Sequence, residues 1–115
     1  MKDDLTLIKH ILDNINKIEK FSKDLKKEDL SKDELKQYAL IRAIELIGEA
    51  AKNITKNMKE KHNEVPWKDI IGSRDRIIHQ YFGINLEIIW NIIKKDIPKL
   101  KVNLDKILKE LESKN

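Results

Sequence analysis

LTLIKHILDNINKIEKF, residues 5–21, is the stretch that decides the fold class. Its apolar side chains recur at steps of three and four residues, at Leu5, Ile8, Ile11, Leu12, Ile15, Ile18 and Phe21. This spacing places one apolar stripe along a helix of about 20 residues. Because such a stripe must be buried against other elements, the sequence predicts that this helix packs within a helical core.

The composition of the whole chain favours the same fold class. Charged residues make up 38% of the 115 residues and aromatic residues 5%, and the chain has only three glycines and two prolines. That balance is typical of amphipathic helices and does not suit a sheet-rich fold. We therefore predict an all-α bundle of about five helices, forming one domain over residues 1–115.

Composition also narrows the functional classes. The net charge of +4 permits weak attraction to a polyanion but falls short of the dense basic surface of a dedicated nucleic-acid binder, so charge alone does not decide the function. The chain has no cysteine, and His10 and His62 lie in unrelated segments, so we expect no disulfide, no metal and no cofactor. No apolar run approaches the roughly 18 residues of a membrane span, and no signal-like start is present. We expect a cytoplasmic protein without membrane association.

A start signal predicts a second helix. Ser31 and Glu34 have the spacing of a capping box, and Leu30 and Leu35 are placed to form an apolar staple. Residues 22–30 before it lack periodicity and are interpreted as a connector. Beyond the start, one helical stripe is apolar, and a separate stripe carries Tyr38, Arg42, Glu45, Glu49 and Lys52.

Turn and capping residues divide the second half of the chain. Ser73 is predicted to cap a helix that carries residues 74–81, which would end at a left-handed Gly83. Asn85 is predicted to cap the last helix. Pro98 should kink or restart that helix because it lacks an N–H.

Arginine is rare in this chain, and its positions mark a candidate site. Only three of the 24 basic residues are arginines, namely Arg42, Arg74 and Arg76. Lysine cannot replace the planar guanidinium where a carboxylate or phosphate is gripped by two hydrogen bonds. Two of the three lie in residues 73–81, beside a histidine and a tyrosine. We predict a site there, with Arg42, Glu49 and Arg76 as a supporting polar face.

The residue types in this segment suit phosphodiester chemistry. In the first helical turn Arg74 would lie beside free N–H groups that favour an anion. Asp75 and His79, four residues apart on a helix, would stack so that the carboxylate accepts a hydrogen bond from the imidazole. His79 would exchange protons with ribose oxygens while Arg74 stabilises charge at phosphorus, which needs no metal. A two-fold dimer would add a second Arg74 and His79 to the same cleft.

The same residues also have purely structural interpretations. His79 would then be a half-buried histidine bonded to Asp75, and the tyrosine two residues later a packed ring with its hydroxyl at the surface. The arginines of this segment would form ion pairs with Glu45 or Glu49 on the second predicted helix. For Arg42 the ion pair is the favoured interpretation.

The pattern Arg74-x4-His79-x-Tyr81 resembles the signature of the HepT-like family in the HEPN superfamily. The similarity extends in order and spacing to residues 42–51, to residues 65–72 and to residues 82–98. The resemblance therefore covers most of the chain.

The resemblance implies an all-helical homodimer that acts as the toxin of a toxin–antitoxin pair and cuts RNA without a metal. It implies that Arg74 and His79 are the catalytic pair and that Asp75 is a polar helper. The implied antitoxin is a minimal nucleotidyltransferase (MNT) that transfers AMP from ATP to Tyr81. Here Asp75 stands where asparagine is common in the family, which would raise the His79 pKa or partly cancel Arg74. The alternative is a helical partner or substrate-binding subunit of the nucleotidyltransferase, without chemistry of its own.

Overall fold

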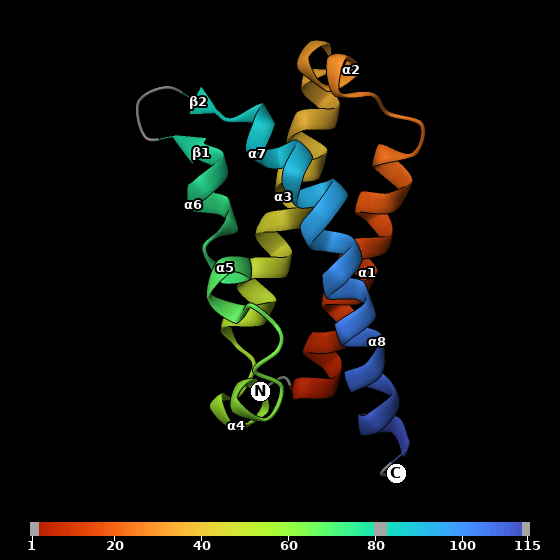
Figure 1. Ribbon diagram of the computed structural model, residues 1–115, viewed down its shortest axis with the longest axis vertical. Helices are drawn as coiled ribbons and strands as arrows, with labels where there is room; N and C mark the ends of the chain where they lie inside the picture. Colours follow the sequence, from red (N-terminus) through yellow and green to blue (C-terminus); the bar gives the residue numbers. More distant parts are fainter. Residues whose placement is uncertain (1–2, 80–82, 114–115) are drawn as a thin grey trace.

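Three long helices run side by side along the molecule. The structure, a computed structural model, describes residues 3–79 and 83–113. In it, α1 (Asp4–Ser22), α3 (Glu34–Lys52) and α8 (Ile97–Ser113) follow the long axis of a body measuring 46 × 30 × 24 Å (Figure 1). α1 packs against both α3 and α8. The predicted all-α fold is confirmed.

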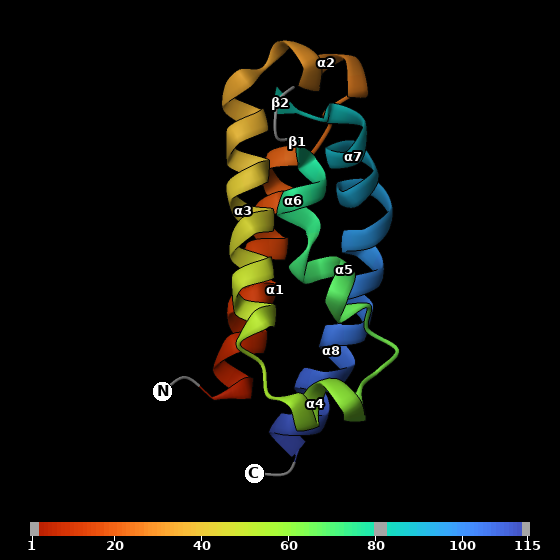
Figure 2. The same cartoon turned by 90° about the vertical axis from the view of Figure 1, so that its left-hand side faces the viewer.

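Short elements connect and cover these three helices. They are α2 (Lys27–Lys32), α4 (Lys56–Lys61), α5 (Trp67–Ile71), α6 (Ser73–Ile77), the antiparallel strands β1 (Ile78–His79) and β2 (Gly83–Ile84), α7 (Leu86–Asn91) and the π-helical turn η1 (Ile92–Asp96). α2, α7 and the strands lie at one end of the bundle, and α4 lies at the other end (Figures 1 and 2). Within the described residues there are more helical segments than predicted, because several connectors fold into single turns.

The first helix forms where its apolar periodicity predicts it. Asp3 caps α1, because its carboxylate accepts a hydrogen bond from the Thr6 N–H at 2.8 Å. The buried side of α1 carries Leu7, Ile8, Ile11, Ile15 and Ile18. The opposite side stays polar. In residues 3–79 and 83–113, no helix combines the length and hydropathy needed to cross a bilayer.

The start of α3 differs from the predicted capping box. Asp33 caps the helix by accepting a hydrogen bond from the Lys36 N–H at 3.0 Å. Ser31 cannot do so, because it lies in α2 and its hydroxyl donates back to the Glu28 carbonyl. The predicted staple is also wrong, since Leu30 is buried whereas Leu35 is 81% exposed. The predicted connector thus contains a helix that buries its last apolar residue.

Gly48 allows α5 to lie directly on α3. A Cβ at Gly48 would lie 3.2 Å from the carbonyl oxygen of Ile70 and 3.4 Å from that of Ile71. These distances leave no room for a side chain without a shift of backbone. The contact fixes α5 on α3, and α6 follows after Gly72 alone.

The last helical region contains a π-helical turn. Asn85 caps α7 as predicted, accepting a hydrogen bond from the Ile88 N–H at 3.1 Å. The Ile97 N–H then donates to the Ile92 carbonyl, five residues earlier, and α8 begins at Ile97. Pro98 lies in the first turn of α8, where its missing N–H favours such a rearrangement of the hydrogen-bond ladder. The predicted kink or restart at Pro98 is seen as a change from a π-helical to an α-helical pattern one residue earlier, at Ile97.

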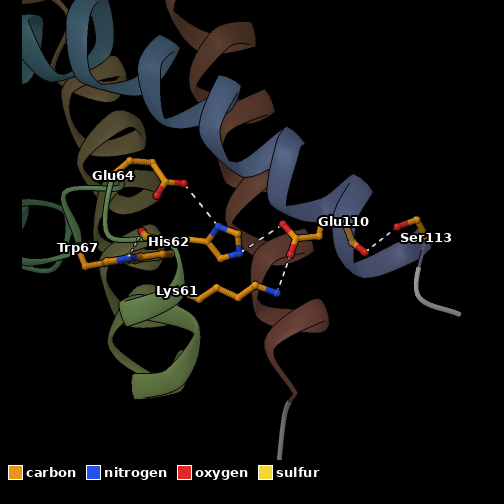
Figure 3. Close-up of polar contacts among 6 residues, drawn as sticks. All are labelled: Lys61, His62, Glu64, Trp67, Glu110 and Ser113. Carbon is orange, nitrogen blue, oxygen red and sulfur yellow. Dashed lines mark hydrogen bonds and ion pairs between the residues drawn. The ribbon is translucent and has the colours of Figure 1, made fainter.

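A polar cluster ties the segment before α5 to the end of α8. The ring of His62 lies between Glu64 and Glu110, with nitrogen–oxygen distances of 3.5 Å and 3.7 Å (Figure 3). Lys61 pairs with the same Glu110 at 2.6 Å. The Trp67 ring N–H donates to the His62 carbonyl at 3.0 Å, and the indole is buried. His62 and Trp67 therefore anchor the approach to α5.

Truncation of a side chain in the hydrophobic core between α1, α3 and α8 should destabilise the fold strongly. We expect Ile15→Ala, at a position with 0% exposure, to lower the free energy of unfolding by about 2–5 kcal/mol. Val102→Ala, at an apolar position of α8 with 55% exposure, should change it by less than about 0.5 kcal/mol. Urea denaturation at one fixed protein concentration measures both. Equal losses would contradict the burial described above.

Candidate active site

The helix that carries the arginine motif is shorter than predicted. α6 ends at Ile77, not Tyr81, and Ile78 already has an extended backbone. Ser73 is not its cap: the residue is buried, and its hydroxyl donates to the Asp69 carbonyl at 2.9 Å. Gly72 occupies the cap position without a side-chain hydrogen bond. The Ser73 hydroxyl bonds to the preceding turn because the Asp69 carbonyl oxygen lies within its reach.

A short hairpin follows α6 and carries the motif histidine. The backbone of His79 lies in β1 and pairs with Gly83 of β2. Gly83 has the predicted left-handed φ of +80°, but within a strand and not at the end of a helix. The stacking of Asp75 and His79 on one helical face is therefore wrong. Tyr81 and the side chain of His79 lie outside the described residues.

Glu45 of α3 lies between two arginines. Nη1 of Arg42 donates to one of its oxygens at 2.6 Å, and Nε of Arg74 donates to the other at 2.5 Å. The Arg42 hydrogen bond is the main reason that the pKa of Glu45 lies below its ordinary value, and the Arg74 hydrogen bond adds to it. The structural interpretation as ion-pair partners is confirmed for Arg42 and for Arg74, both of which pair with Glu45. The Arg74 guanidinium is oriented through Nε.

A surface groove surrounds Arg74. Of the described residues, it is lined by Ile44, Glu45, Gly48, Glu49, Lys52, Ile71, Arg74 and Asp75. The Arg74 side chain is 53% exposed and that of Asp75 is 88% exposed, so solvent reaches both. Nη1 of Arg74 lies 3.9 Å from the Asp75 carboxylate. The groove thus presents a guanidinium, held by an α3 carboxylate, at an open surface.

Arg76 points to a different part of the molecule. Its Nη2 lies 3.8 Å from the Asp96 carboxylate and 3.4 Å from the Ser73 hydroxyl oxygen. It lines a second cleft, on the other side of α6 from the groove of Arg74. The predicted supporting face is therefore divided: Glu49 lines the groove, and Arg42 reaches it through Glu45, whereas Arg76 does not.

Two residues that shape these surfaces were given no role from the sequence, although both lie in the blocks that resemble the family. Gly48 allows a close backbone approach, which a glycine inside a strong helical pattern can signal. Asp96 pairs with Arg76, and nothing in its local sequence links the two.

The helical bundle, the arginine held at a groove and the adjoining hairpin with the motif histidine together define a HEPN-like protein. The chain belongs to the family described as Ribonuclease HepT-like, whose model matches residues 11–107. The resemblance inferred from the motif blocks is thereby confirmed.

Individual relatives cover nearly the whole chain. A protein of Caldanaerobacter subterraneus subsp. tengcongensis named "Putative RNase" is 43% identical over 96% of this chain and 98% of its own length. A "Probable ribonuclease HepT" of Thermococcus cleftensis is 41% identical over 89% of this chain and 93% of its own. A Methanocaldococcus jannaschii protein named "Gamma-glutamylcyclotransferase and putative RNase" is 44% identical over 96% of this chain, which spans half of that protein. No solved structure matches the chain.

The ion pairs of Glu45 should make stability depend on pH. Because the folded-state pKa of Glu45 is lowered, its contribution is present above the ordinary carboxyl value of 4.5 and is lost as the pH falls below it. We expect wild type to lose more stability than Glu45→Gln over that fall, since the amide does not titrate. Urea denaturation from pH 7 to pH 3 measures the difference. Parallel curves for the two proteins would contradict the network.

Proposed function

We propose that this protein is a metal-independent endoribonuclease and the toxin of a HEPN/MNT toxin–antitoxin pair. Its membership of the Ribonuclease HepT-like family and the names of its relatives support a ribonuclease. The single observation that carries the proposal is the placement of Arg74 at an open groove, oriented by Glu45 and four residues before the hairpin that holds His79.

Cleavage would proceed by attack within the RNA strand. The ribose 2′-oxygen bonds to the adjacent phosphorus, the bond from phosphorus to the 5′-oxygen breaks, and a 2′,3′-cyclic phosphate remains. His79 takes the 2′-hydroxyl proton or gives a proton to the departing 5′-oxygen. Arg74 stabilises the negative charge that builds up on the phosphate oxygens. Glu45 is a positioning residue, since it holds Nε of Arg74 and does not engage either Nη atom, of which Nη1 lies 3.9 Å from the Asp75 carboxylate.

A site made by two copies would bring two guanidinium groups to one cleft. Each copy lines its groove with the carboxylates Glu45, Glu49 and Asp75 and with the cations Lys52 and Arg74. A two-fold axis repeats this whole set, so the second copy would contribute through the position of its Arg74 and not through a change in the ratio of charges.

The exposed side of α3 offers apolar surface for this homodimer. Leu35 is 81% exposed and Tyr38 is 58% exposed, and both lie on the helix that carries Glu45. Covering these side chains in a dimer would remove apolar area from water close to the proposed site.

The decisive test is RNA cleavage in EDTA. We expect wild type to produce cyclic-phosphate ends, and His79→Ala or Arg74→Ala to cleave at least about 100-fold more slowly. Lys17→Ala is the control, because it removes an exposed cation of α1 that lines neither cavity. Identical product traces for wild type and His79→Ala would end the proposal. Such traces with intact antitoxin binding would favour the non-catalytic partner of a nucleotidyltransferase.

Mixing two inactive variants separates a shared site from a site within one copy. In a mixed dimer, the Arg74→Ala copy keeps His79 and the His79→Ala copy keeps Arg74. The two intact residues form a working pair only if a site takes its arginine from one copy and its histidine from the other. We expect the mixture, after unfolding and refolding together, to recover activity that neither variant has alone. No recovery, with mixed dimers demonstrated by mass, would show that each copy uses its own pair.

The proposed antitoxin step modifies Tyr81. The phenol oxygen attacks the α-phosphorus of ATP, a bond from phosphorus to the tyrosine oxygen forms, pyrophosphate leaves and the phenol proton is released. The added phosphate would repel substrate phosphate beside Arg74 and His79.

We expect a minimal nucleotidyltransferase with ATP to raise the mass of wild type by one AMP and to stop cleavage. After the same treatment, Tyr81→Phe should keep cleaving RNA and show no change in mass. If the nucleotidyltransferase and ATP also stop cleavage by Tyr81→Phe, Tyr81 is not the target.

A further inference from the structure

The cleft that receives Arg76 is a separate, more enclosed cavity of about 290 Å³. Its walls come from α3, α5, α6, η1 and the start of α8, and its apolar floor includes Ile44, Ile70 and Ile97. That size lies at the small end of ligand pockets in proteins. It therefore suits one flat ring system better than a peptide or a long chain.

Polar groups also line this cleft, namely Glu64, Asp69, Ser73, Arg76, Asp96, Lys99 and Asn103. Arg76 is only loosely held by the Ser73 hydroxyl, the Asp69 backbone carbonyl and the Asp96 carboxylate, at 3.4 to 3.8 Å. The side chains of Arg76 and Asp96 are 44% and 56% exposed. An ion pair this open contributes about 0–1 kcal/mol, so a ligand that engages both partners separates them at little cost.

The π-helical turn builds one wall of the cleft. Ile92 and Asp96, its first and last residues, both line the cavity. A π-helical turn costs regular hydrogen bonding, and such turns are frequent at functional sites. The turn places a carboxylate at the mouth of the cleft and an aliphatic side chain beneath it.

We infer that this cleft binds a guanine base of the RNA substrate. The Watson–Crick edge of guanine presents two adjacent donors, N1–H and the N2 amino group, which match the two oxygens of the Asp96 carboxylate. Its O6 and N7 accept hydrogen bonds from the Arg76 guanidinium. Adenine, cytosine and uracil each place an acceptor next to the donor on that edge, so none satisfies both carboxylate oxygens. The aliphatic floor would cover a face of the flipped base.

The position of the cleft fits one substrate strand across both surfaces. Arg74 and Arg76 lie on α6 and project to opposite sides of it, and Ile44 lines both cavities. α5 and α6 lie in front of the bundle, between α3 and the α7–α8 side, in the view of Figure 2. The two arginines start about 3 Å apart along the helix axis but lie on opposite sides of a helix about 10 Å across, so one strand would have to pass around α6 to place a phosphate at Arg74 and a base at Arg76. The inference rests on the proposed ribonuclease function for its substrate.

Binding of single nucleotides tests the cleft without cleavage. We expect guanosine 3′-monophosphate to bind wild type at least about tenfold more tightly than the adenosine, cytidine and uridine monophosphates, by calorimetry at pH 7. Asp96→Asn should remove this preference, and Asp13→Asn, the same change on α1, should keep it. Arg76→Ala is a second variant that should also lose the preference. Equal binding of all four nucleotides to wild type, or a guanine preference that survives both cleft variants, would overturn the inference.

Cleavage of RNA distinguishes this inference from the proposed function. We expect wild type to cut beside guanosine in an oligonucleotide that contains all four bases, and Asp96→Asn to cut with a changed pattern. Cleavage that shows no guanosine dependence overturns the base site and leaves the ribonuclease intact. Guanosine binding that depends on Asp96, in a protein that cuts no RNA, supports the base site and contradicts the proposed ribonuclease function.

Discussion

The contact between α3 and α5 at Gly48 is the constraint on which the candidate site depends. Two backbone carbonyls, of Ile70 and Ile71, occupy the space that a side chain would need. Since only Gly72 separates α5 from α6, this contact also sets the position of Arg74. Glu45 lies one turn before Gly48 on α3, where it meets the Arg74 guanidinium. A packing requirement and an ion pair thus use the same turn of one helix.

The long helices could be predicted from the sequence because their burial follows a simple period. The apolar stripe of α1 and the cap at Asn85 both depend on residues close together in the chain. Competition among neighbouring polar groups could not be predicted in the same way. Ser31 and Ser73 have the chemistry of caps, yet each hydroxyl donates to a carbonyl of the preceding turn. Such choices depend on which backbone group is already within reach.

The site was predicted in part, for a related reason. The motif residues were found through their types and spacing, and Arg74 does lie at an open groove. The end of α6 at Ile77 was missed because it depends on the pairing of the next residues, in β1, with β2, which comes later in the chain. Asp96 was missed because it approaches Arg76 only in the folded bundle, where the end of η1 comes close to α6. Local patterns identified the candidate residues, and tertiary structure decided their neighbours.

The π-helical turn also changes which way a single amphipathic pattern faces. Apolar residues recur at helical spacing from Ile89 through Leu104 without an interruption in the sequence. One extra residue per turn rotates everything that follows by about 100° relative to a straight helix. Accordingly α7 contacts α3 and α6, whereas α8 contacts α1. One continuous apolar stripe thus packs against different helices before and after η1, and the π-helical turn sets the change in direction between the two parts.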